Sequence, residues 1–467
     1  MPRLLVVGSR LVAVIVAGAF FMELLDGTVI TTALPGIASS FGVGAVDAGL
    51  GVTAYLLTVA VMIPLSGWLS DRFGARPVFC VAIVVFTLAS VLCASSQTLA
   101  EFVLARVVQG VGGAMMVPVG RTVVLRGAAK ADLMAATAII TWPALIAPVL
   151  GPPIGGVITT YGSWRWIFLI NVPLGLFALV SALLLVKASE RQRRPFDGFG
   201  FALSAVAIAC LVYGMDQAGG QNWLLTAGLL VVGLGVGVVA VRHARRHPTP
   251  LVDLSPLRIR TYAATSAEGS LLRLAINMVP FLLPLLFQVG FGLSAVTSGL
   301  LVLAVFAGNL AMKTITTPIV RRFGFRRVLV GNGVLVAVSL AACALFSAST
   351  PYWLIAGVCF LGGAFRSLEF TGVNTLAFAD VPAASMSAAS TLNATITQLA
   401  TGLGVAVAAT VVHVAAGGGT PSVLDFRIGF LVGAAIALVG ALLFLRLDRT
   451  AGVEVSAGRP RTPASHA

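Results

Sequence analysis

Long apolar segments, each separated from the next by a short polar loop, follow one another along almost the whole chain. An α-helix needs about 20 apolar residues to cross the hydrocarbon core of a bilayer. The pattern therefore predicts an all-α membrane protein with fourteen spanning helices. They lie roughly at 11–37, 49–69, 78–95, 100–120, 134–159, 166–186, 199–214, 223–241, 262–287, 295–317, 328–346, 352–377, 387–415 and 427–446.

These segments form two similar halves that are offset by 250 residues. Phe41–Val52 is similar to Phe291–Val302, and Arg72–Arg76 is similar to Arg322–Arg326. Repeats of this kind are typical of transporters, which bind their substrates near the bilayer midplane between the halves. Both repeats must start on the same side of the membrane, so the segment between them must contain an even number of helices. Two central helices meet that condition.

The repeat divides the chain into four parts. We expect an N-terminal six-helix bundle at 1–190, a two-helix insertion at 191–250, a C-terminal six-helix bundle at 251–449 and a disordered cytoplasmic tail at 450–467. The two central helices have no counterpart in the repeat. We therefore expect them to lie at the periphery.

Composition and charge support a membrane protein. The chain is 58% hydrophobic and only 10% charged, whereas soluble domains have about 25% charged residues. The net charge of +14 does not indicate nucleic-acid binding, because most of the 30 lysines and arginines fall in loops on one side of the predicted membrane. By the positive-inside rule that side is cytoplasmic and holds both termini. We expect a monomer in the lipid bilayer of a bacterial inner membrane.

The polar loop between the second and third predicted helices reads Gly67-Trp68-Leu69-Ser70-Asp71-Arg72-Phe73-Gly74-Ala75-Arg76-Pro77. Gly67 allows close helix approach, Gly74 allows a tight turn, and Asp71 can pair with arginines. The loop resembles the signature loop of the major facilitator superfamily. That resemblance implies a conformational latch made by Gly67, Asp71, Arg72, Gly74 and Arg76. The alternative is an orientation signal with a turn. We expect a weaker latch in the second half, where Arg321 replaces Asp71.

The fourth predicted helix carries Arg106, Gln109, Gly110 and Gly113 on one face, because residues spaced by three or four lie together on a helix. The spacing resembles the R-x-x-Q-G motif of the superfamily. An arginine there is costly in a membrane unless it is paired or hydrated. We predict a role for Arg106 in proton coupling, with a structural ion pair as the alternative.

In the fifth predicted helix the run Ala147–Gly156 resembles the antiporter motif G-x-x-x-G-P-x-x-G-G, with Ala147 in place of its first glycine. The residues of this run to which the resemblance gives a conformational role are Pro148, Gly151, Pro152, Gly155 and Gly156. The prolines bend the helix, and the glycines allow it to pack tightly. The resemblance implies antiport, and the alternative is an ordinary kinked helix.

The first predicted helix carries the run Leu25–Pro35, which resembles the L-D-x-T signature of fourteen-helix drug:proton antiporters of the EmrB/QacA type. Trp164–Pro173 resembles the segment that enters their sixth helix. These motifs cover the first half densely and the second half sparsely. The resemblance implies a major facilitator fold and proton-driven export of small lipophilic compounds.

Six charged side chains fall near the predicted midplane. At about 1.5 Å per residue, they lie roughly 15 to 22 Å from the inner ends of their helices, in a core about 30 Å thick. They are Glu23, Asp26, Arg106, Arg273, Arg366 and Glu369. In one interpretation, Glu23–Arg273 and Arg366–Glu369 are ion pairs that hold the halves together. In the other, Asp26 or Glu23 binds a proton whose release is coupled to substrate binding.

We therefore predict separate residues for protons and for cargo. Asp26, Glu23 and Arg106 are the predicted proton-coupling residues, and replacing Asp26 with Asn is expected to stop proton-driven transport. The predicted substrate-binding residues are Arg273, Asn277, Arg366, Glu369 and Gln109. Weaker candidates, which could equally be hydrogen bonds between helices, are Gln288, Asn309, Asn374, Asn393, Gln398 and His413.

No cofactor is expected, because the proton gradient would drive transport. The sequence has no phosphate-binding loop, no His/Cys metal spacing and no catalytic constellation, so we predict neither an enzyme nor a metal site. Three arginines and three carboxylates share the midplane, which leaves an organic-anion or metabolite exporter as an alternative to a drug exporter. A non-transporting membrane sensor is the remaining alternative.

Overall fold

The computed structural model describes residues 2–127, 133–186, 195–216, 223–382, 385–417, 419–448 and residue 451. Every regular element within these ranges is a helix. Thirteen of the described helices are long and apolar enough to cross a membrane. The remaining long helix is α5 (Leu133–Tyr161), and the structure describes only part of its side chains. The predicted all-α membrane fold is confirmed, while the predicted tail at 450–467 lies almost wholly outside the described residues.

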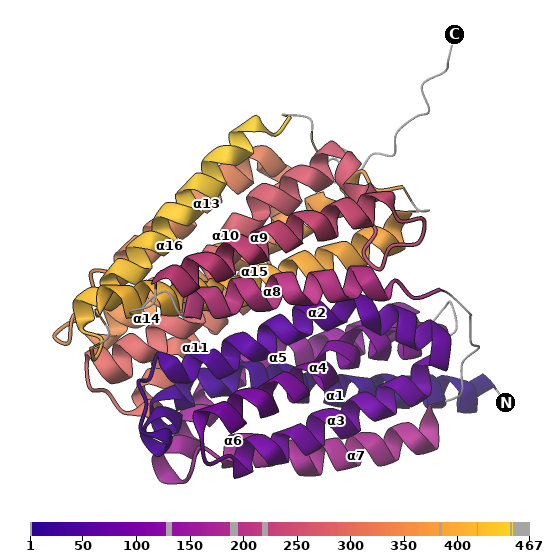
Figure 1. The fold of residues 1–467 in the computed structure, drawn as a ribbon, viewed down its shortest axis with the longest axis horizontal. Helices are drawn as coiled ribbons and strands as arrows, with labels where there is room; N and C mark the ends of the chain where they lie inside the picture. The colour runs from indigo at the N-terminus through magenta and orange to yellow at the C-terminus, as the bar shows by residue number, and fades with distance from the viewer. Residues whose placement is uncertain are drawn as a thin grey trace.

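Figure 1 shows two helical bundles, with the N-terminal half below and the C-terminal half above. The N-terminal half contains α1 (Pro2–Phe41), η1 (Asp47–Gly49), α2 (Leu50–Phe73), α3 (Ala75–Ser95), α4 (Leu99–Gly127), α5, α6 (Trp166–Leu169) and α7 (Asn171–Leu185). Between the halves come α8 (Gly198–Asp216) and α9 (Trp223–Arg246). The C-terminal half contains η4 (Ser255–Arg258), α10 (Arg260–Leu285), η5 (Leu286–Gly290), α11 (Ala295–Met312), α12 (Thr316–Phe323), α13 (Phe325–Cys343), α14 (Tyr352–Ala379), α15 (Met386–Ala415), α16 (Val423–Leu443) and η7 (Phe444–Arg446).

The backbone turns repeat at the offset found in the sequence. Gly42 and Gly292 both have a φ of 67°, and Gly74 and Gly324 have φ values of 94° and 76°. Glycine adopts this left-handed region without steric cost, which explains why it occupies all four positions. The two halves are therefore built on the same turns.

The two signature loops are tied to the last helix of their own half. Arg76 donates from Nη2 to the carbonyl oxygen of Leu183, near the end of α7, at 2.5 Å. Arg326 donates in the same way to the carbonyl oxygen of Leu445, beyond α16, at 2.6 Å. The last carbonyls of a helix lack intrahelical donors, so an arginine satisfies them well. Arg76 and Arg326 thus stiffen each half internally.

The halves meet chiefly along two helix pairs, α5 with α11 and α2 with α15, and more lightly where α1 approaches α10. The predicted antiporter motif lies in the first contact. A Cβ atom on Gly156 would lie 2.5 Å from the carbonyl oxygen of Ala295, and one on Gly299 would lie 2.4 Å from that of Pro152. On its other side, α5 approaches α1 at Gly155, where a Cβ would lie 2.5 Å from the carbonyl oxygen of Val29. These backbone approaches explain why the motif needs glycine.

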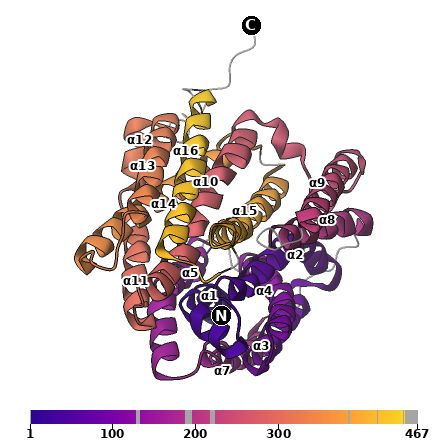
Figure 2. The ribbon, with the colours of Figure 1, turned by 60° about the vertical axis from the view of Figure 1, so that its left-hand side comes forward.

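The central pair is peripheral, as expected. Helix α8 packs on α9 and contacts both α2 and α15, so it lies along the seam between the halves. Only 6% of the most apolar stretch of α9 is buried within the protein. Figure 2 shows α8 and α9 at the outside of the bundle. Helix α8 begins at the end of the bundle where α1 also begins (Figure 1). We call this end, which carries Arg72 and Arg76, the basic face.

Candidate functional site

A cavity of about 310 Å³ lies between the two halves. It is bounded by α1, α2 and α5 on one side and by α10, α11, α14 and α15 on the other. Most of the described lining residues are apolar, and they include one acidic and one basic side chain. The lining residues are Glu23, Leu24, Gly27, Thr28, Thr31, Val52, Tyr55, Leu56, Pro148, Val149, Asn277, Pro280, Phe281, Phe306, Asn309, Leu310, Arg366, Gln398, Thr401 and Val405.

Glu23 is the acid of this cavity. Its Oε1 accepts a hydrogen bond of 3.2 Å from the hydroxyl of Tyr55. Its Oε2 has no hydrogen-bond partner among the described residues. Glu23 therefore presents one unsatisfied oxygen at the boundary between the halves.

Asp26 lies one turn further along α1 but faces the interior of the first half, and only 3% of it is exposed. Its Oδ2 accepts from Arg106 Nη1 at 2.6 Å, a buried ion pair. Its Oδ1 accepts from the amides of Gln109 at 3.0 Å and Asn171 at 2.8 Å. Ser90 receives hydrogen bonds from the same two amides. Both carboxylate oxygens of Asp26 are therefore satisfied by side chains of its own half.

Tyr55 connects Glu23 with this buried network. The guanidinium carbon of Arg106 lies 4.2 Å from the centroid of the Tyr55 ring, a cation–π contact. The Tyr55 hydroxyl reaches Glu23 on the other side. A Cβ atom on Gly113 would lie 2.7 Å from that hydroxyl, so the motif glycine leaves room for it. A rearrangement at Glu23 can thus reach Arg106 through one side chain.

The second half holds its arginines differently. Arg273 donates from Nη2 to Asn374 at 2.9 Å and to Asn393 at 3.3 Å, and it does not line the cavity. Glu369 is buried and accepts from Asn332 at 2.7 Å. Arg366 reaches Asn277 at 3.5 Å and faces the cavity.

The two ion pairs of the structural interpretation are wrong. Among the described residues, neither Glu23–Arg273 nor Arg366–Glu369 comes within ion-pair distance, and the midplane pair that forms is Asp26–Arg106. The offset that aligned Glu23 with Arg273 relates positions by symmetry, and symmetry does not bring such positions into contact.

The predicted site residues therefore separate into three groups. Glu23, Pro148, Asn277 and Arg366 line the cavity. Asp26, Arg106 and Gln109 form the network behind it, so Gln109 contacts Asp26 and Arg106 instead of the cavity. Arg273 and Glu369 lie behind the cavity wall in the second half.

Sequence reasoning did not single out Tyr55, Ser90 or Asn171. A signal for Tyr55 and Asn171 was present, since a tyrosine hydroxyl or an amide within an apolar helix must find a hydrogen-bond partner. The sequence could not show which residue that partner is, because Asp26 is 145 residues from Asn171 in the chain.

Comparisons with known proteins agree with this architecture. The profile of the Major Facilitator Superfamily matches residues 16–199 and 266–466. MdtD of Escherichia coli K12, named for a proposed role in multidrug resistance, is 39% identical over 461 residues, which cover 96% of this chain and 97% of its own. MdtD of Shigella sonnei is 38% identical over 462 residues with the same coverage.

Solved structures give the same fold. A D-xylose–proton symporter superposes with a TM-score of 0.67 at 16% identity, over 95% of this chain and 98% of its own. The nucleoside transporter NupG superposes with a TM-score of 0.66 at 16% identity, over 93% of this chain and 98% of its own. At these identities the likeness concerns the fold alone.

Proposed function

Because the chain belongs to the major facilitator superfamily, a family of transporters, we propose that it exports small lipophilic compounds in exchange for protons. The observation that carries this proposal is Glu23, which lines a mostly apolar cavity between the halves and has one carboxylate oxygen without a hydrogen-bond partner among the described residues. An apolar cavity with few polar groups suits lipophilic cargo. The antiporter motif and the first-helix signature support the EmrB/QacA type, and the name of MdtD supports drug-like cargo.

Glu23 is the better proton carrier of the two acids in α1. A proton that binds Asp26 must displace Arg106 or an amide donor, because both oxygens of Asp26 are occupied. A proton that binds Glu23 can take Oε2 without breaking a contact. Protonation of Glu23 would remove the only acidic charge among the described lining residues, and cargo held by that charge would be released. Asp26 and Arg106 then stay paired, and the change at Glu23 reaches them through Tyr55.

The proposal is tested with wild-type protein in proteoliposomes. Addition of a transported compound to detergent-solubilised protein should release protons, and an imposed proton gradient should drive uptake into inverted vesicles. A compound that moves at the same rate with and without the gradient, and that releases no protons, would contradict proton coupling.

Organic anions are the second candidate cargo, favoured by Arg366. Its Nη1 has no hydrogen-bond partner among the described residues, and the side chain faces the cavity. If the cargo is anionic, Arg366→Gln should lower its transport by about tenfold or more, since a charge-assisted hydrogen bond contributes about 1.5–3 kcal/mol. If the cargo is a lipophilic cation, the same change should leave transport intact or raise it. Competition between lipophilic cations and organic acids in one assay separates these outcomes.

Alternating access predicts a strong effect at Gly156. Its substitution by alanine would place Cβ 2.5 Å from the Ala295 carbonyl oxygen, and overpacking of this kind costs about 1–3 kcal/mol. We expect Gly156→Ala to depopulate the conformation with α5 against α11, by about tenfold, and to slow transport.

The matched control is Gly36→Ala in α1, because no atom lies within 4 Å of a Cβ at that position. Spin-label distances between α5 and α11 measure the populations in both variants. Equal populations in the two would argue against a role for this contact in the transport cycle.

A further inference from the structure

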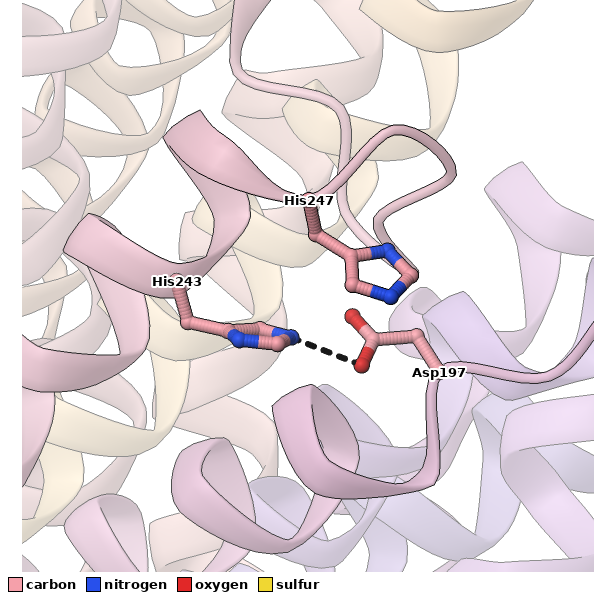
Figure 3. Close-up of side chains that lie close together, drawn as sticks. All are labelled: Asp197, His243 and His247. Atoms are coloured by element: carbon pink, nitrogen blue, oxygen red, sulfur yellow. Dashed lines mark hydrogen bonds and ion pairs between the residues drawn. The ribbon is translucent and has the colours of Figure 1, made fainter.

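Three potential metal ligands converge at the basic face, outside the central cavity. Asp197 precedes α8, while His243 lies in the last turn of α9 and His247 directly follows that helix. Their ligand atoms all lie within 4.8 Å of one another. Figure 3 shows both imidazole rings directed at the carboxylate of Asp197.

The backbone explains how these side chains meet. His243 and His247 are four residues apart, and the N–H of His247 donates to the carbonyl oxygen of His243 at 2.8 Å, so the helical turn continues to His247. Residues with this spacing share one helix face. Asp197 caps the start of α8 through Gly200 N at 2.9 Å, and the packing of α8 on α9 brings it to that face.

Asp197 is a buried side chain that three hydrogen bonds hold in place. Only 6% of the residue is exposed. Burial tends to raise its pKa, but hydrogen bonds from Gly200 N, His243 and Leu251 N outweigh burial and hold the pKa below its usual value. The side chain is therefore a carboxylate near neutral pH. An Asp–His hydrogen bond alone would need only His243, whose Nε2 lies 2.8 Å from Oδ1.

His247 is the residue that an Asp–His pair does not explain. Its ring packs against that of His243, with centroids 5.0 Å apart, and in Figure 3 no hydrogen bond joins it to Asp197. Its Nδ1 accepts a long hydrogen bond of 3.3 Å from Thr249 N, which leaves Nε2 for a ligand. Binding through Nε2 would move the ring proton to Nδ1 and release Thr249.

We propose that Asp197, His243 and His247 form a binding site for a divalent transition-metal ion, with Zn²⁺ as the best match. Two imidazoles and one carboxylate are a donor set that Zn²⁺ takes at about 2.0–2.2 Å. Such distances put ligand atoms roughly 3.3 Å apart around a tetrahedral ion. His243 Nε2 and Asp197 Oδ1, now 2.8 Å apart, would therefore separate slightly to admit the ion, and all three ligand atoms already lie within 4.8 Å of one another. No fourth ligand joins the cluster among the described residues, which leaves one position for water and makes the ion exchangeable.

An ion at this site would fasten the central pair to the signature loop. Phe196, next to Asp197, stacks on Trp68 of α2 with ring centroids 4.6 Å apart. The Phe199 ring packs edge-on against His243 at 5.3 Å. The ion would therefore tie the start of α8 to the end of α9, beside the Phe196–Trp68 contact that connects this region to the end of α2. The sequence did not predict this site, because Asp197 lies 46 residues before His243.

The test is Zn²⁺ binding to full-length protein purified in detergent with a tag that contains no histidine. Equilibrium dialysis should find about one Zn²⁺ per chain, and Co²⁺ should give the visible absorption of a tetrahedral site. His247→Gln keeps the Asp197–His243 hydrogen bond but should weaken Zn²⁺ binding by about tenfold or more, since even outer partners of metal ligands contribute 10–100-fold. Asp197→Asn should do the same while retaining a good helix cap.

His413→Gln is the matched control, because His413 also approaches an aspartate, Asp47 at 3.4 Å, but belongs to no three-ligand group among the described residues. This variant should bind Zn²⁺ as the wild type does. Unchanged Zn²⁺ affinity in His247→Gln, or no saturable binding by the wild type, would overturn the proposal. Binding is measured without cargo or gradient, so the result does not depend on the proposed transport function.

Discussion

Replacing Glu23 with Gln is expected to abolish proton-coupled transport while the protein still folds and inserts. Glutamine can keep the hydrogen bond from the Tyr55 hydroxyl at 3.2 Å, but it cannot take up and release a proton. Because Glu23 is the acid of the cavity lining, we expect gradient-driven transport to fall to the level of protein-free liposomes. A pH-sensitive dye inside the vesicles, read together with labelled cargo, measures both fluxes.

The matched control is Glu369→Gln. Glu369 is also a buried midplane acid, but it lies behind the cavity wall and accepts from Asn332, so its replacement should leave proton coupling intact. Wild-type gradient dependence in Glu23→Gln would remove Glu23 from the mechanism. Loss of coupling in Asp26→Asn alone would instead identify Asp26, the residue that the sequence motif favours, as the proton-binding residue.

Replacing Arg106 with Met is expected to destabilise the protein more than replacing any other midplane arginine. Arg106 is fully buried and pairs with Asp26 at 2.6 Å. Removal of one partner leaves an unpaired charge in the interior, which typically costs about 3–5 kcal/mol. The melting temperature of the purified protein in detergent should fall sharply, and yields from the membrane should fall with it.

Two variants isolate the cause of that loss. The double variant with Arg106→Met and Asp26→Asn removes the stranded carboxylate and should recover much of the stability. Arg273→Met removes an equally buried arginine whose partners among the described residues are the amides of Asn374 and Asn393, and it should be nearly neutral. Equal melting temperatures for Arg106→Met and Arg273→Met would show that the ion pair contributes little.

The antiporter motif illustrates what a sequence can and cannot predict about packing. Its small residues predicted close helix contacts, and Gly155 and Gly156 make them. The partners could not be predicted, because adjacent glycines on α5 face different helices, α1 and α11. Likewise, the repeated glycine turns predicted two equivalent halves, but not that Arg76 and Arg326 would cap the last helix of each half.

The sequence by itself determined the membrane fold, the two-fold repeat and the positions of the charges along each helix, because hydrophobic length and turn chemistry are local properties of the chain. Only the tertiary structure decided which charges meet. Glu23 and Asp26 are three residues apart and point about 60° away from each other around α1, so one lines the cavity and the other pairs with Arg106. Arg366 and Glu369 have the same spacing on α14, and Glu369 pairs with Asn332 instead. Helix rotation and packing depend on the whole bundle, so no segment of the sequence specifies them alone.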